Sequence, residues 1–122
     1  MISEKLKEVL ANEGVVAIAT LGPDGPHLVN SWNKYITIDG NRLLIPVGHM
    51  NQTEANIAFN NQVLLTINSA AVEGNHGPGA GFLIKGTAAF ITSGPEFQMQ
   101  SERFKWLRAT MAVTITSATQ TW

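Results

Sequence analysis

The sequence predicts a mainly β protein, a small antiparallel Greek-key-like barrel with short flanking helices. Three observations support this fold class. Some six or seven short apolar segments have strand character, whereas only three segments have helical character. Glycine, proline, asparagine and aspartate separate these segments, as is typical of turns. The predicted strands and helices do not alternate as βαβ units, so antiparallel pairing is favoured over a parallel sheet.

The first elements along the chain are a short helix and two strands. Residues 3–12 predict an amphipathic helix with Ser3 as its N-cap. The apolar run 15–20 predicts a buried strand, and residues 27–32 predict the next strand. The segment 22–25 predicts the turn between them, because proline presets φ and glycine permits positive φ.

The middle of the chain predicts a hairpin, a short helix and another apolar strand. The hairpin turns at Asp39-Gly40-Asn41, a sequence that suits a tight reversal. Thr53 is expected to cap the helix. These elements are the strands 35–38 and 42–47, the helix 54–59 and the strand 63–67.

The last third of the chain predicts a loop followed by a strand, a helix and a final strand. The glycine-rich segment 72–81 is interpreted as a loop. The segment 93–96 is a capping-box pattern, so a helix is expected to begin at Ser93 and end near Arg108. The strands on either side of this helix are expected over 82–91 and 111–116.

The composition indicates a single domain over residues 1–122 with a formal net charge of −1. Apolar residues make up 44% and charged residues 14%, so part of the surface is expected to be buried against a partner chain or a ligand. The balanced charge argues against nucleic acid as a partner. The sequence lacks cysteine, signal-peptide character and an apolar run of membrane length. We therefore expect a soluble, cytoplasmic protein without disulfides, thiolate nucleophiles or membrane contact.

Two segments are candidate phosphate sites. The glycines of 77–81 precede a strand and do not open a helix, so a flexible loop is the simpler interpretation. The segment 51–54 is the better candidate, because a helix start offers unpaired N–H groups and Thr53 adds a hydroxyl. An ordinary helix cap is the alternative. The three histidines share no metal-ligand spacing, and no nucleophile-elbow pattern appears.

Aromatic residues indicate a flat ligand. On the predicted C-terminal helix, Trp106 lies about 180° from Phe97 and off the core stripe. On the strand 27–32, alternation places Asn30 and Trp32 on one face, which suits a ligand that stacks and forms hydrogen bonds. Core or interface packing is the alternative for each tryptophan.

Several segments resemble the small FMN-binding proteins of anaerobic bacteria, within the pyridoxamine 5′-phosphate oxidase-like FMN-binding split-barrel superfamily. The resemblance implies a six-stranded antiparallel split β-barrel, FMN bound without a covalent link, and a homodimer. It extends over nearly the whole chain. The segments that carry it are 12–20, 24–33, 53–56, 81–84, 94–97, 103–106 and 120–122.

The resemblance also implies the FMN-binding residues. They form a strand that meets the flavin and its phosphate, two aromatic neighbours of the isoalloxazine ring, a strand end and loop along the flavin, and a phosphate site. Trp122 matches a terminal hydrophobic residue that covers the flavin from the other subunit. The strand that meets the flavin comprises Asn30, Ser31 and Trp32, and the two aromatic neighbours are Tyr35 and Trp106. The strand end and loop comprise Pro46, Val47, Gly48, His49 and Met50, and the phosphate site comprises Gln52 and Thr53.

Two residues depart from the family pattern. Gln52 stands where the family usually has lysine or arginine. A neutral amide donates a hydrogen bond but does not neutralise a phosphate dianion, so weaker FMN binding is expected. Trp122 is larger than the leucine expected there, and we expect it to stack on the flavin and quench its fluorescence.

The leading hypothesis is an electron-transfer flavoprotein, and no residue is assigned a catalytic role. The resemblance implies that Glu13 places a negative charge near the flavin, which would lower the flavin potential. The redox partner is not specified by the sequence. One alternative is a flavin reductase or oxidase that uses NAD(P)H, although a Trp122 lid argues against bulky substrates. A second alternative is a flavin-storage module.

Overall fold

The structure is a computed structural model that describes residues 2–122. Within this range the chain forms three α-helices, one 3-10 helix and seven β-strands. The helices are α1 (Glu4–Leu10), η1 (Asn33–Tyr35), α2 (Asn51–Phe59) and α3 (Pro95–Arg103). The strands are β1 (Val15–Gly22), β2 (Gly25–Trp32), β3 (Thr37–Asp39), β4 (Arg42–Val47), β5 (Gln62–Gly74), β6 (Gly77–Ile91) and β7 (Ala109–Gln120).

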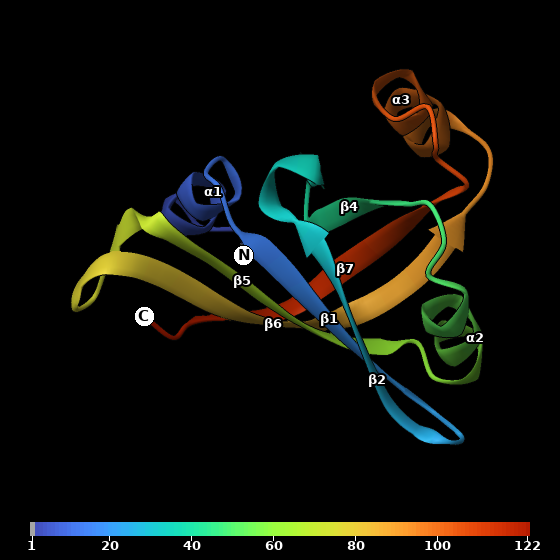
Figure 1. Cartoon of the computed structure of the whole chain (residues 1–122), viewed down its shortest axis with the longest axis horizontal. Helices are drawn as coiled ribbons and strands as arrows, with labels where there is room; N and C mark the ends of the chain where they lie inside the picture. Colours follow the sequence, from blue (N-terminus) through green and yellow to red (C-terminus); the bar gives the residue numbers. More distant parts are fainter. Residues whose placement is uncertain (1) are drawn as a thin grey trace.

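The strands form one twisted antiparallel sheet in the order β2-β1-β5-β6-β7-β4-β3 (Figure 1). β1 pairs with β5, and β4 pairs with β7, so strands that are distant in the sequence become neighbours. The mainly β antiparallel fold class is therefore confirmed. The sheet has the seven strands that the apolar segments predicted, where the resemblance implied six, and the three-residue β3 forms a short edge strand beside β4.

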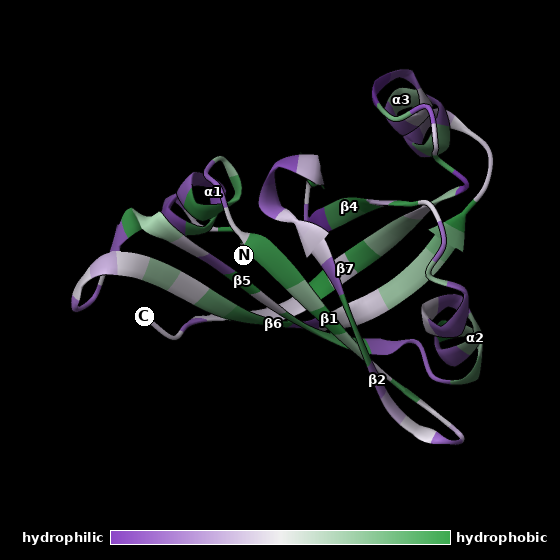
Figure 2. Cartoon of the chain, in the orientation of Figure 1, coloured by the Kyte–Doolittle hydropathy of each residue, from purple (hydrophilic) through white to green (hydrophobic). Residues whose placement is uncertain are grey.

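The hydrophobic core lies on one face of the sheet. Alternate side chains of β1 and β5, such as Ile18 and Leu65, are fully buried. α1 covers part of this face with Leu6 and Val9. The predicted helix cap is confirmed, because the Ser3 hydroxyl accepts the N–H of Leu6 at 3.2 Å. Figure 2 shows the hydrophobic residues concentrated along the strands.

The hairpin of β5 and β6 shows that the loop expected over 72–81 was wrong. The two strands pair as far as Gly74 and Gly77, so only residues 75–76 form the turn. Gly77 and Gly79 have φ angles of +107° and +108°, a region that other residues rarely adopt. Glycine-rich segments carry little apolar periodicity, and here the pairing with the neighbouring strand decides the conformation.

α3 is shorter than the expected helix. It begins after Gly94 instead of at Ser93, and it ends before the expected boundary at Arg108. The capping box is also absent, because the carboxylate of Glu96 accepts a hydrogen bond from Arg42 at 2.9 Å and does not reach back to the helix start. The carboxylate that would cap the helix locally is instead engaged in a tertiary ion pair with Arg42.

α2 begins earlier than expected. Its N-cap position is Met50, which has a left-handed conformation with φ of +51°, and no side chain caps the helix. Thr53 therefore lies inside the first turn, where it is fully buried. The expected cap at Thr53 was wrong because the preceding loop, and not a capping hydroxyl, sets the helix start.

Candidate functional site

Nine predicted site residues line a single cavity of about 230 Å³, and Val29 is its remaining lining residue. The cavity lies between the end of β2, η1, the loop that follows β4 and the segment between α3 and β7. Antiparallel pairing of β4 with β7 brings the last two of these segments together. The nine residues are Asn30, Ser31, Trp32, Tyr35, Pro46, Gly48, His49, Met50 and Trp106.

Three aromatic rings stand together beside this cavity. The ring of Tyr35 lies 5.0 Å from the ring of Phe104 and 5.9 Å from that of Trp106, measured between centroids. Phe104 and Trp106 are 5.2 Å apart. Phe104 is buried, whereas the indoles of Trp106 and Trp32 are about half exposed, at 48% and 52%. The cluster offers flat apolar surface to a planar ligand.

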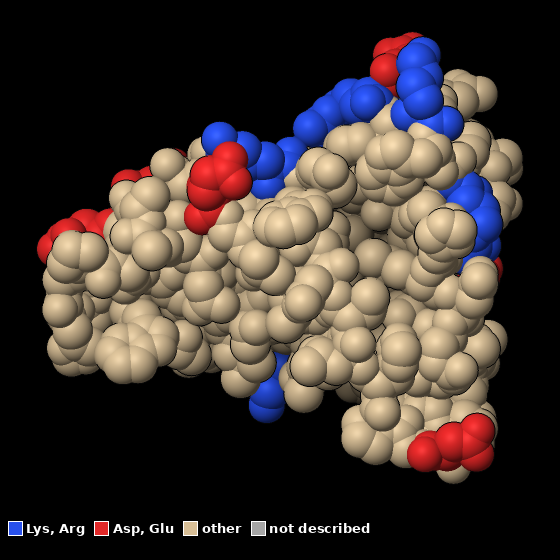
Figure 3. Space-filling model, viewed as in Figure 1, with Lys and Arg blue, Asp and Glu red and all other residues tan. Residues whose placement is uncertain are grey.

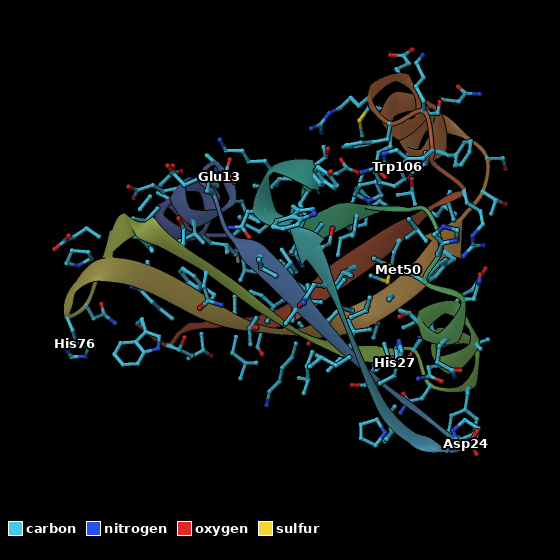
Figure 4. All side chains as sticks on the ribbon, in the orientation of Figure 1. Glu13, Asp24, His27, Met50, His76 and Trp106 are labelled. Atoms are coloured by element: carbon cyan, nitrogen blue, oxygen red, sulfur yellow. The ribbon has the colours of Figure 1, made fainter. Side chains whose placement is uncertain are left out.

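Trp106 is placed by tertiary contacts and not by a helical face. It follows α3, where the chain is no longer helical. The expected position of Trp106 on a helix, opposite Phe97, was therefore wrong, although its place near the site was predicted. The backbone N–H of Arg108 donates to the carbonyl of Val47 at 2.8 Å and fixes this segment against β4. Figure 4 shows Trp106 and Met50 on the same side of the molecule.

Arg108 also holds the loop that leads from β4 to α2. Its guanidinium donates to the carbonyl of His49 at 2.6 Å and forms an ion pair with Glu54 of α2 at 2.9 Å. This explains how Met50 is held in a left-handed conformation at the cavity wall. Arg108 was not predicted as a site residue, because neither partner of its side chain is close to it in the sequence.

Three predicted site residues of the same half of the molecule do not line the cavity. Val47 and Thr53 are fully buried, and the hydroxyl oxygen of Thr53 has no hydrogen-bond partner within the described residues. Gln52 donates to the side-chain oxygen of Asn56 at 2.9 Å. It lines a separate cavity of about 210 Å³, together with Asp24, Gly25, Pro26, His27 and Asn56.

Trp122 lies at the other end of the sheet. It lines a cavity of about 300 Å³ between β5 and β6, and its ring is 60% exposed. Its ring contacts that of His76. Figure 4 shows His76 at the end of the molecule opposite Trp106. Trp122 and the aromatic cavity are therefore not brought together within one chain.

Comparison with known proteins agrees with this architecture. A profile of the pyridoxamine 5′-phosphate oxidase family matches residues 2–120. The chain belongs to the pyridoxamine 5′-phosphate oxidase family. An FMN-binding protein of Nitratidesulfovibrio vulgaris (strain DSM 19637 / Miyazaki F) is 60% identical to it over 115 residues, 93% of each chain.

Solved structures show the same fold at low sequence identity. HupZ of Group A Streptococcus is 17% identical and superimposes with a TM-score of 0.80, over 99% of this chain and 94% of that chain. An FMN-binding protein from Syntrophomonas wolfei subsp. wolfei is 11% identical with a TM-score of 0.69, over 93% and 81% of the two chains. At these identities the likeness concerns the fold alone.

In this member of the pyridoxamine 5′-phosphate oxidase family, buried amide side chains stabilise segments that carry the residues lining the cavity. The side chain of Asn33 donates to the carbonyls of Val9 and Asn68 at 3.1 and 2.9 Å. Asn33 lies between Trp32 and Tyr35 in the sequence, so these bonds anchor the turn that carries both aromatic residues. The sequence signal was a lone asparagine in a loop, which does not reveal burial.

A second buried amide joins α3 to the sheet. Gln100 donates to the carbonyl of Leu44 at 3.1 Å and accepts the hydroxyl of Thr110 at 2.7 Å. Both Gln100 and Thr110 are fully buried. Phe104 and Trp106 follow α3 directly. These two hydrogen bonds therefore fix the position of the end of α3, and with it the start of the segment that carries both aromatic residues.

Two sets of ion pairs in this family member involve residues of η1, β3, β4 and α3. Lys34 of η1 forms an exposed ion pair with Glu13 at 3.2 Å. Arg42 binds Glu96 at 2.9 Å and also contacts Asp39, so the pKa of the Glu96 carboxyl lies below its usual value and that of Arg42 above it. Within residues 2–122, no group of three or more His, Cys, Asp or Glu side chains could hold a metal ion.

The helices of the described residues are short. None of them is long and apolar enough to cross a membrane.

Proposed function

We propose that this chain is an FMN-binding flavoprotein that transfers electrons, and that it holds one FMN per chain without a covalent bond. The observation that carries the proposal is the cavity in which nine predicted site residues meet. The 60% identical relative, which is an FMN-binding protein, supports the choice of ligand.

The cavity residues fit an isoalloxazine ring. Tyr35 and Trp106 present aromatic faces, and Asn30 and Ser31 add an amide and a hydroxyl. A flat ring with polar edges needs both kinds of group. When bound, FMN supplies one- and two-electron redox chemistry, whereas the residues of this chain orient the cofactor and exclude water from it.

The start of α2 fits the phosphate end of FMN. The helix has no side-chain cap, so its first N–H groups are available to an anion. The buried hydroxyl of Thr53 has no partner within the described residues, and Gln52 offers a neutral amide beside it. We propose that these groups bind the phosphate, with less charge compensation than a basic residue at position 52 would provide.

A homodimer completes the proposed site. The cavity of about 230 Å³ is smaller than the roughly 300–1,000 Å³ typical of small-molecule sites, so a second wall is required. Trp122 is too far away within the same chain to provide that wall, as Figure 4 illustrates with the neighbouring His76. We propose that Trp122 of the other protomer covers the flavin.

The solvent-facing side of β1, β2 and β5 fits the dimer interface. Leu21, Leu28 and Leu64 on this face are 50%, 68% and 46% exposed. Exposed apolar patches of this kind are typical of interfaces. Figure 3 shows a wide area without charged side chains, with the charged groups mostly at its margins. The outward positions of these strands are Val15, Ala17, Ala19, Leu21, Pro26, Leu28, Asn30, Trp32, Gln62, Leu64, Thr66, Asn68 and Ala70.

Glu13 is expected to lower the flavin potential less than an unpaired carboxylate would. Its carboxylate is paired with Lys34 at 3.2 Å, and both side chains are exposed to solvent. An exposed pair is screened by water and salt, so the two charges largely cancel at a distance. The proposed electron carrier therefore depends more on the aromatic wall and on the dimer cover than on Glu13.

FMN titration of the purified protein tests the proposal. We expect non-covalent binding that approaches one FMN per chain, with quenched flavin fluorescence, and light scattering of the loaded protein should give a dimer. Failure to bind FMN would overturn the proposal. Rapid reduction by a redox protein without turnover of NAD(P)H supports the electron carrier, whereas sustained NAD(P)H oxidation assigns a flavin reductase. A tightly bound flavin that reacts with neither a redox protein nor NAD(P)H assigns a flavin-storage function.

A further inference from the structure

The C-terminal residue is docked onto the sheet and is not a free end. The backbone N–H of Thr121 donates to the carbonyl of Gly81 at 2.8 Å, and that of Trp122 donates to the same carbonyl at 3.4 Å. The side chain of Gln120 donates to the terminal carboxylate of Trp122 at 2.7 Å. The main chain of Trp122 is therefore held in place, and only the orientation of its indole is left to be fixed.

The imidazole of His76 packs against the indole of Trp122. The two rings stand edge to face, with centroids 6.0 Å apart and an interplanar angle of 83°. This is the arrangement that aromatic pairs prefer. His76 lies in the two-residue turn between Gly74 and Gly77, at the tip of the β5–β6 hairpin.

The hairpin tip and the C-terminal segment are locked together. The side chain of Gln120 also contacts the side-chain oxygen of Asn75 at 3.3 Å, beside His76. A Cβ on Gly74 would lie 2.0 Å from the carbonyl oxygen of Gly79 and 3.1 Å from the carboxylate carbon of Trp122. The two backbones thus pack directly on each other, and the turn holds the imidazole at a fixed place relative to Trp122.

We propose that His76 is a positioning residue for Trp122, and that it holds the indole in the orientation that closes the flavin site of the other protomer. This rests on the proposed function, in which Trp122 is the cover. The physical reason is preorganisation. A terminal indole without a neighbour would lose side-chain freedom on binding, whereas one held by His76 has already lost it.

A double-mutant cycle of His76→Ala and Trp122→Ala tests the proposal. Both side chains are exposed, so neither change should prevent folding, and melting temperatures check this. His76→Ala is expected to weaken FMN binding about two- to ten-fold, the range that an aromatic pair accounts for, and to raise FMN fluorescence. In the Trp122→Ala background, the same change should have no effect, because no indole is left to position. His76→Phe keeps an aromatic edge and should restore both measurements.

A readout without FMN separates the inference from the proposed function. In ¹H–¹⁵N spectra of the flavin-free protein, the indole N–H of Trp122 is the signal lost in Trp122→Ala. His76→Ala should shift this signal and increase its mobility. If Trp122→Ala leaves FMN affinity and fluorescence unchanged, the cover itself is overturned, together with this inference. If Trp122→Ala changes both but His76→Ala changes neither the indole signal nor FMN binding, only the inference is overturned.

Discussion

Gly48 leaves space that the ring of Trp106 fills. A Cβ on Gly48 would lie 3.1 Å from Cε3 of Trp106, closer than an ordinary van der Waals contact. Gly48 follows the end of β4, and Trp106 follows α3, so this approach joins two segments far apart in the sequence. Because position 48 has no side chain, the indole of Trp106 can lie directly against the backbone there.

Gly48→Ala should therefore disturb the site more than the fold. Gly48 does not have positive φ, so alanine fits its backbone, but the indole must shift by a few tenths of an ångström. We expect FMN affinity to fall several-fold with little change in melting temperature. Fluorescence titration measures the affinity. The smaller ring in Trp106→Phe should remove most of the effect, and an equal loss in both backgrounds would argue against this contact.

Gln52→Lys should tighten FMN binding. A charge-assisted hydrogen bond to phosphate is stronger than a neutral one, and we expect a gain of about 1 kcal/mol, roughly five- to ten-fold in affinity. The gain should shrink as salt is raised, because salt screens the added charge. Titration at several salt concentrations measures this. Gln52→Met is the matched control without charge, and unchanged affinity of Gln52→Lys would show that position 52 lies away from the phosphate.

Gln100→Met should lower the free energy of unfolding by about 2–6 kcal/mol. The change leaves the hydroxyl of Thr110 and the carbonyl of Leu44 buried without their partner, and each such group costs about 1–3 kcal/mol. Urea denaturation of the flavin-free protein at fixed concentration measures the loss. Adding Thr110→Val should cost less than the sum of the two single changes. Strict additivity would mean that the two side chains do not act as a pair.

Glu96→Gln should reduce the acid sensitivity of the fold. The hydrogen bond from Arg42 lowers the pKa of the Glu96 carboxyl in the folded state. Its stabilisation is therefore present above the unfolded-state pKa of about 4.5 and is lost as pH falls through the lower folded-state pKa. Melting temperatures below pH 5 should fall less steeply in Glu96→Gln than in the wild type. Parallel pH profiles would contradict a role for this pair.

Local signals in the sequence were sufficient where one segment decides its own conformation. The cap at Ser3 and the turn at 22–25 were predicted from the chemistry of a few adjacent residues, and the structure has both. The strands around Ile18 and Leu65 were predicted from their apolar runs. The resemblance added the residues of the cavity, because it carries information on pairs that are distant in the sequence.

Local signals failed where a distant partner competes for the same group. Glu96 bonds to Arg42 and not to the start of its own helix. Residues beyond Arg103 have helical composition, but Phe104 is buried beside Tyr35 and the N–H of Arg108 pairs with β4. These contacts stabilise a tight turn at residues 105–106 in place of a further helical turn.

Periodicity, turn residues and aromatic content are local properties, so the mainly β class, most strands, most turns and the chemical character of the site could be predicted from the sequence. The way in which the site is supported could not be predicted, because it depends on tertiary contacts. The buried amides Asn33 and Gln100, the bridge made by Arg108 and the contact of Gly48 with Trp106 all join residues that lie far apart in the chain. Such pairings arise from packing and from the need to satisfy buried polar groups, which no local pattern encodes.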